Sequence, residues 1–318
     1  MRFLTNVVMA KPIKRMNYDH ILGLMREYDK ESIYEKVNII PESRELYQAL
    51  ADYIDLSSFS RVSVLGIDIY RYGQYKHLEQ TLIPVLFKVL FEKAIRLCLE
   101  NNQYIFQRYT KDRIERSFIS TGDGGFLIFD TPLHALFFAI NFEVMVRAYN
   151  AYHLFPKLRK IIGNLSLRYA ITLDTIFSFE NNFYGSAIIN NARILEKDSL
   201  NRCLMDQNSY DWFLANIDGI ENLQVYTIED ISNIQEFLEY DYKYIDDGEN
   251  QIIDTEISRR SGIINTDILK IGQIHSKEVL MNIYNVHIQV ALKIFADDKR
   301  DLKRTITVTL GNLNTAGI

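Results

Sequence analysis

RVSVLGIDIY, residues 61–70, is a short run of apolar and β-branched residues that ends in an acidic and an aromatic side chain. Such a run predicts a central strand of a sheet, buried on both faces, with Asp68 at its end. Downstream, residues 77–101 carry apolar side chains at helical spacing, beginning with Leu78 and Leu82. This spacing predicts a long helix that packs on the sheet.

Two further strands are predicted on either side of a glycine turn. Residues 116–121 and 125–129 flank the turn Gly-Asp-Gly at 122–124, whose glycines allow a tight bend with positive φ. Pairing of this hairpin with the first strand would bring Asp123 beside Asp68. Two converging carboxylates, together with substrate phosphates, are the ligands that Mg²⁺ or Mn²⁺ takes up. Taken singly, each aspartate also fits an ordinary strand-end cap or turn residue.

Three more elements complete the predicted core. Thr131-Pro132 is a good helix start, so residues 133–149 are predicted to be helical. Residues 165–174 then form a strand, and a helix covers 188–196. The order of strand, helix, two strands, helix and strand predicts an α+β fold with a ferredoxin-like βαββαβ core.

This core, residues 61–231, has flanking regions of different character. Residues 1–60 are predicted to form a helical N-terminal arm that serves packing or dimerisation. Residues 232–318 are predicted to form a small β-rich module, because the runs NVHIQVALKI (285–294) and RTITVTL (304–310) alternate in polarity. This module resembles small sensor-type domains, which implies a sensor-like role.

Composition excludes several classes of protein. The net charge of -5 in 318 residues, with both signs spread along the chain, argues against a protein that wraps nucleic acid. Only two cysteines occur, Cys98 and Cys203, which favours a reducing compartment and buried thiols.

Charged residues interrupt the most apolar stretch, 78–99, so no membrane insertion is expected. We expect a cytoplasmic protein. No phosphate-binding loop, nucleophile elbow or histidine pair at metal-site spacing is present.

IDIYRYG (67–73) and ISTGDGGFLIF (119–129) resemble the first and second metal motifs of class III nucleotide cyclases. YGSAIINNARIL (184–195) resembles the third motif of that family. The resemblance covers about residues 61–228, with the three motifs in the family's order. It implies that Asp68 and Asp123, with the backbone carbonyl of Ile69, bind two Mn²⁺ or Mg²⁺ ions.

The third motif implies residues that act on the substrate. Arg193 lies where the family places the arginine that stabilises charge on the α-phosphate, although a surface helix arginine is the alternative. Asn190 lies one residue after the family's asparagine position, where this chain has Ile189. The family's late triphosphate-binding lysine is missing, and Lys197 or Arg202 are its candidate substitutes.

The base-binding positions also depart from purine-selective members of the family. Ile119 and Asn182 occupy the positions that usually select a purine, and Tyr70-Arg71 follows the first aspartate. These departures resemble the bacterial pyrimidine cyclases of the Pycsar antiphage systems. Bulky Tyr or Arg side chains would favour a single-ring base, although Tyr70 also fits an ordinary strand residue and Arg71 a solvated one.

The resemblance therefore implies a lyase that converts UTP, or CTP, to the 3',5'-cyclic monophosphate and pyrophosphate by two-metal catalysis. The product would be a second messenger for a separate effector protein in antiphage defence. The family builds its sites between two subunits, so a homodimer is implied. Two alternatives remain: a purine (adenylate or guanylate) cyclase, and an inactive nucleotide-binding sensor.

Overall fold

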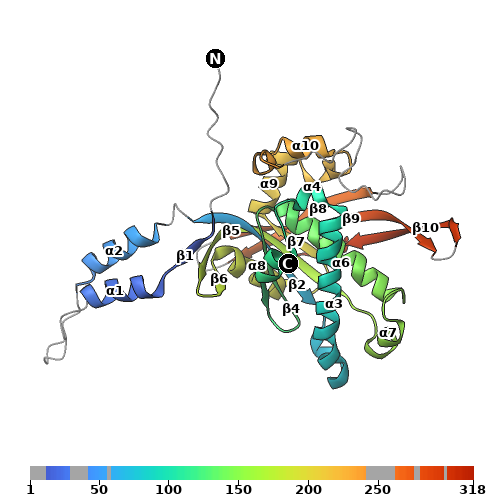
Figure 1. The fold of residues 1–318 in the computed structure, drawn as a ribbon, viewed down its shortest axis with the longest axis horizontal. Coiled ribbons are helices and arrows are strands. Elements are labelled where there is room, and N and C mark those ends of the chain that lie inside the picture. Colours follow the sequence, from blue (N-terminus) through green and yellow to red (C-terminus); the bar gives the residue numbers. More distant parts are fainter. Residues whose placement is uncertain (1–11, 29–41, 56–58, 241–261, 276–279, 297–298) are drawn as a thin grey trace, which may run out of the picture.

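The computed structural model describes residues 12–28, 42–55, 59–240, 262–275, 280–296 and 299–318. It contains a mixed sheet with helices on both faces (Figure 1), which confirms the predicted α+β class. The strands are β1 (Lys14–Met16), β2 (Ser60–Ile69), β3 (Phe118–Ser120), β4 (Gly124–Phe129), β5 (Leu167–Phe179), β6 (Asn182–Tyr184), β7 (Cys203–Asp206), β8 (Gly262–His275), β9 (Leu280–Ala296) and β10 (Lys299–Leu310). The α-helices are α1 (Tyr18–Tyr28), α2 (Arg44–Ile54), α3 (His77–Asn101), α4 (Gln103–Phe106), α5 (Lys111–Arg116), α6 (Pro132–Asn150), α7 (Pro156–Ile162), α8 (Ser186–Lys197), α9 (Gln207–Ile217) and α10 (Ile228–Ser232).

The centre of the sheet has the predicted ferredoxin-like arrangement. Its strand order is β5-β2-β4-β3, with β2 antiparallel to both of its neighbours. Helix α3 lies between β2 and β3 in sequence, and α6 lies between β4 and β5. These four strands and two helices are the βαββαβ unit.

The side chains of β2 alternate between two helical layers. Leu65 and Ile67 belong to the main core with α3 and α6, which lie side by side in Figure 1. Val64 belongs to a smaller cluster, and Gly66 lies directly under α8. Because alternate strand residues share a face, Asp68 is on the α8 side of the sheet.

The last three strands continue the same sheet. Strand β9 pairs antiparallel with β7, and β8 and β10 pair with β9. Residues of the predicted C-terminal module are thus hydrogen-bonded to the core, while a functional division near residue 232 stays a prediction. Within this region, residues 241–261 lie outside the described part of the chain.

The N-terminal arm is a pair of helices that lies apart from the core in Figure 1. Helices α1 and α2 contact each other, and β1 joins them to the sheet by pairing in parallel with residues 177–179 of β5. Neither helix contains a buried residue. Residues 1–11, 29–41 and 56–58 of the predicted arm lie outside the described chain.

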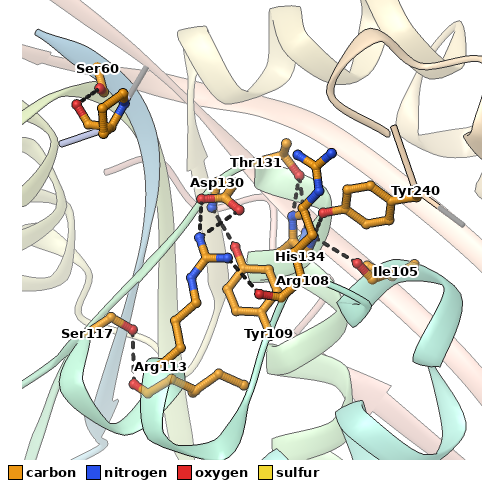
Figure 2. Close-up of polar contacts among 12 residues, drawn as sticks. Ser60, Ile105, Arg108, Tyr109, Arg113, Ser117, Asp130, Thr131, His134 and Tyr240 are labelled. Carbon is orange, nitrogen blue, oxygen red and sulfur yellow. Dashed lines mark hydrogen bonds and ion pairs between the residues drawn. The ribbon is translucent and has the colours of Figure 1, made fainter. Parts of the chain in front are cut away.

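A buried polar network ties the start of α6 to α4 (Figure 2). His134 is fully buried, with Nδ1 at 2.8 Å from the hydroxyl of Thr131 and Nε2 at 3.0 Å from the carbonyl of Ile105. Burial lowers the pKa of His134 to about 4, so the ring is neutral at pH 7. The ring then accepts the Thr131 hydroxyl proton and donates to Ile105. His134 is a structural residue.

We expect this histidine to make unfolding pH-dependent. Its folded pKa is below the unfolded value of 6.5, so stability is lost as pH falls from 6.5 toward 4. Between pH 7 and pH 5 the loss attributable to this group is about 2 kcal/mol. Urea unfolding of wild type and His134→Gln at both pH values measures it, because other titrating groups are common to both proteins. Equal acid sensitivity in the two proteins would contradict the assignment.

Candidate active site at the end of strand β2

The hairpin predicted around Asp123 lies beside Asp68. Asp68 pairs with Gly124, and the backbone N–H of Ile69 donates to the carbonyl of Asp123 at 3.2 Å. A Cβ on Gly124 would be 2.0 Å from the carbonyl oxygen of Ile67, so glycine is required for this close pairing. The structure thus brings Asp68, Ile69 and Asp123 together at one end of the sheet.

A residue that the sequence analysis did not identify completes this cluster. Arg168, on β5 directly opposite Asp68, donates from Nε to the Asp68 carboxylate and from Nη1 to the backbone carbonyl of Asp198. Burial raises the pKa of Asp68, while Arg168 acts in the opposite direction and Asp123 adds to the rise. The cluster therefore combines two nearby carboxylates with one guanidinium.

Helix α8 carries the three predicted catalytic residues on one face. Asn190, Arg193 and Lys197 are spaced by three and four residues, which places them along one side of a helix. Asn190 is half-buried and donates to Asp174 at 3.5 Å, and Lys197 is exposed. Arg193 is half-buried and makes no hydrogen bond or ion pair within the described chain.

The opposite face of α8 fastens the helix to the sheet. Asn191 is fully buried and donates to the carbonyls of Val64 and Ala170 at 2.8 and 2.9 Å. Arg193 follows two residues later, about 200° around the helix, and therefore points away from the sheet. Asp68 lies on the sheet, so the Arg193 side chain is directed away from it, and within the described residues the cation paired with Asp68 is Arg168.

Two of the four predicted base-binding residues adjoin the carboxylates. Tyr70 follows Ile69, and its hydroxyl donates to the carbonyl of Ser199 at 3.1 Å. Arg71 has a left-handed backbone with φ of 59° and places its guanidinium 4.9 Å from the centre of the Tyr70 ring. The two residues therefore contact each other and directly follow Asp68 and Ile69 in the chain.

Of the other two, Ile119 lies on the same hairpin as Asp123, and Asn182 lies away from it. Asn182 is exposed in β6, which pairs with Phe179 at the far end of β5 from Arg168. Ile119, on β3, packs against the small cluster under α8 that includes Val64. In one chain, Asn182 therefore does not share a site with Tyr70 and Arg71.

Arg202, an alternative to Lys197 for binding the triphosphate, is engaged elsewhere. Its side chain is 1% exposed and donates from Nε to the Asp198 carboxylate at 2.8 Å and from Nη1 to the carbonyl of Ala316 at 2.7 Å. A triphosphate could reach it only if both interactions were broken. Lys197, which is exposed, therefore stays the proposed substitute for the triphosphate-binding lysine.

The donors at the end of β2 suit a hard divalent cation. Across the described residues there is no group of three or more His, Cys, Asp or Glu side chains that could hold a metal. The candidate donors are instead two carboxylates and a backbone carbonyl, and Mg²⁺ commonly binds one or two carboxylates together with substrate phosphates. The residues present therefore fit the implied ions.

Comparison with known proteins gives likenesses in structure only. No family model and no curated protein sequence matches the chain. An adenylate/guanylate cyclase/hydrolase from Silicibacter pomeroyi is 12% identical, with a TM-score of 0.40 over 71% of this chain and 95% of that one. The adenylyl cyclase CyaB from P. aeruginosa is 14% identical, with a TM-score of 0.37 over 76% and 96%.

A third solved structure is a non-canonical dimeric guanylyl cyclase domain from Blastocladiella emersonii. It is 8% identical to this chain, with a TM-score of 0.40 over 71% of this chain and 95% of that one. These likenesses concern the course of the backbone and assign no substrate. In the described residues, no helix is long and apolar enough to cross a membrane.

Proposed function

We propose that the chain is a class III nucleotide cyclase that converts UTP, or CTP, to the 3',5'-cyclic monophosphate and pyrophosphate. The observation that carries the proposal is the convergence of Asp68 and Asp123 beside Arg168 at the end of β2. The sequence motifs that resemble the family's metal motifs are the same segments that meet there. Asp68, Asp123 and the carbonyl of Ile69 are the proposed ligands of two Mn²⁺ or Mg²⁺ ions.

The proposed reaction forms a bond from the ribose 3'-oxygen to the α-phosphorus, releases the proton of the 3'-hydroxyl to solvent, and breaks the bond from the α-phosphorus to the departing pyrophosphate. Metal ions held by Asp68, Asp123 and the carbonyl of Ile69 would lower the pKa of the 3'-hydroxyl and neutralise charge on the triphosphate. Arg193 donates to the α-phosphate oxygens, where negative charge builds up in the transition state. Lys197 and Arg168 supply positive charge toward the departing pyrophosphate, and Asn190 orients the ribose.

The outward face of α8 supports a homodimer with two sites at its interface. Arg193 points away from Asp68 of its own chain, so a second chain related by a two-fold axis would supply it. The same symmetry would bring the partner's α8 and β6 toward Tyr70 and Arg71. In this arrangement Asn182 and Ile119 complete the base-binding wall.

The biological setting is part of the same proposal. A cytoplasmic cyclase of this kind would signal phage infection to a separate effector protein through cyclic UMP or cyclic CMP. The pyrimidine preference is supported by the Tyr70 and Arg71 side chains, which stack on each other just after Asp68 and Ile69 in the chain. They leave less room for a two-ring base.

A nucleotide-binding sensor without turnover is the second candidate. The observation that favours it is the ion pair of Asp68 with Arg168, in which a proposed metal ligand already has a counter-charge. Turnover in the presence of metal separates the two candidates.

The deciding experiment incubates purified protein and Mn²⁺ with ATP, GTP, CTP or UTP separately and identifies products by mass spectrometry. We expect cyclic UMP or cyclic CMP, with pyrophosphate in equal amount. Cyclic AMP or cyclic GMP would overturn the pyrimidine preference and keep the cyclase. Binding of a triphosphate without any product would favour the sensor.

A further inference from the structure

The C-terminal segment, residues 311–318, returns to the core beside the candidate active site. Asn285 of β9 is 1% exposed and donates to the carbonyls of Asn312 and Asn314 at 2.9 and 3.1 Å. Ile318 packs with the small apolar cluster that includes Ile194 and Leu195 of α8. The segment is therefore fixed against both the sheet and the end of α8.

A buried ion pair connects this segment to the active site. Arg202 and Asp198 are both 1% exposed, and the Arg202 guanidinium bridges the Asp198 carboxylate and the Ala316 carbonyl. The carboxylate also accepts from the backbone N–H of Leu200 at 3.1 Å. These contacts fix the backbone where α8 ends.

The backbone carbonyl at this point is the one that holds Arg168. Arg168 donates from Nη1 to the Asp198 carbonyl and from Nε to the Asp68 carboxylate. Within the described residues, these two acceptors are the only hydrogen-bond partners of the Arg168 guanidinium. The direction of its guanidinium thus depends on where the Asp198 carbonyl lies.

We propose that Arg202 is a positioning residue of the active site. By linking Ala316 to Asp198, it fixes the position of the Asp198 carbonyl. That carbonyl in turn orients the Arg168 guanidinium toward Asp68. The proposal rests on the proposed cyclase function. It adds a dependence of that site on residues 311–318, which touch neither Asp68 nor Asp123.

The first test is a double-mutant cycle. Arg202→Lys keeps a buried cation beside Asp198, but an ammonium lacks the rigid fork that spans two acceptors. We expect Arg202→Lys to lower kcat about tenfold in the wild-type background and less than about twofold in an Arg168→Gln background, because both changes disturb one guanidinium. An equal fold-loss of kcat in the two backgrounds would overturn the proposal, because a general structural defect would lower kcat by the same factor whether or not Arg168 is present.

A second variant tests the role of the C-terminal segment directly. Asn285→Leu removes the donor to the Asn312 and Asn314 carbonyls without touching Arg202 or Arg168. We expect it to lower kcat and to show the same dependence on Arg168. Wild-type kcat in Asn285→Leu would overturn the role of the C-terminal segment.

A chemical readout separates this inference from the cyclase assignment. Phenylglyoxal modification of Arg168, followed by peptide mass spectrometry, reports release of its guanidinium whether or not any triphosphate is turned over. We expect modification to be at least about threefold faster in Arg202→Lys than in wild type, and unchanged in Arg108→Lys, which alters a surface ion pair with Glu239. An unchanged rate in Arg202→Lys would overturn the proposal even in an active enzyme.

Discussion

Asp68→Asn is expected to lower turnover by the proposed cyclase by about three orders of magnitude, because losing the carboxylate proposed to bind metal would remove several kcal/mol of transition-state stabilisation. The change keeps the size of the side chain and its position opposite Gly124 and Arg168. The measurement is the initial rate of cyclic nucleotide formation with saturating Mn²⁺.

A matched control is Asp112→Asn, on α5. The Asp112 side chain is 74% exposed and lies 3.5 Å from Arg116 in a surface pair. Such a pair contributes little to stability, so this variant should retain wild-type turnover. If Asp68→Asn, with an unchanged unfolding midpoint, kept more than about a tenth of wild-type turnover, Asp68 would not be a metal ligand in catalysis.

Mixing two inactive variants is expected to restore activity. Asp68→Asn disables the carboxylate side of a site and Arg193→Ala disables the arginine side. In a two-fold dimer with sites shared between subunits, each mixed dimer has one intact site and one site that lacks both groups. Random pairing of equal amounts then gives about a quarter of wild-type activity.

The mixing experiment needs denaturation and refolding together, or coexpression, so that chains exchange. Separately refolded variants combined without exchange serve as the control and should stay inactive. Activity that does not exceed the sum of the separate variants would show that Arg193 and Asp68 do not serve one shared site. Asn190 could be tested in the same way, since it lies on the same face of α8.

Much of the fold follows from local sequence patterns. The predicted helix at 77–101 coincides with α3, and the predicted central strand at 61–70 differs from β2 by one residue at each end. Both segments have long, regular apolar patterns. The extension of β5 to Phe179 and its turn into β6 were not predicted, because the turn contains no glycine and Glu180 adopts a φ of 53°.

The parts of the candidate site that could be predicted from sequence are those whose residues lie in a recognisable motif. Asp68 and Asp123 meet because strand pairing and a glycine turn bring them together. Arg168 was missed because its partner, Asp68, is 100 residues away in sequence. The one available signal was Arg168 itself, a charged residue near the start of the apolar strand LRYAI. It lies on the same face of the sheet as Asp68.

The opposed directions of Arg193 and Asp68 bear on how such an enzyme would respond to its own abundance. At concentrations well below the dimer dissociation constant, the rate of product formation would rise with the square of the amount of chain. A cell with few copies would be nearly silent, and a modest increase in expression would produce a disproportionate signal. The amount of protein synthesised would thus itself determine when the cell begins to make the product.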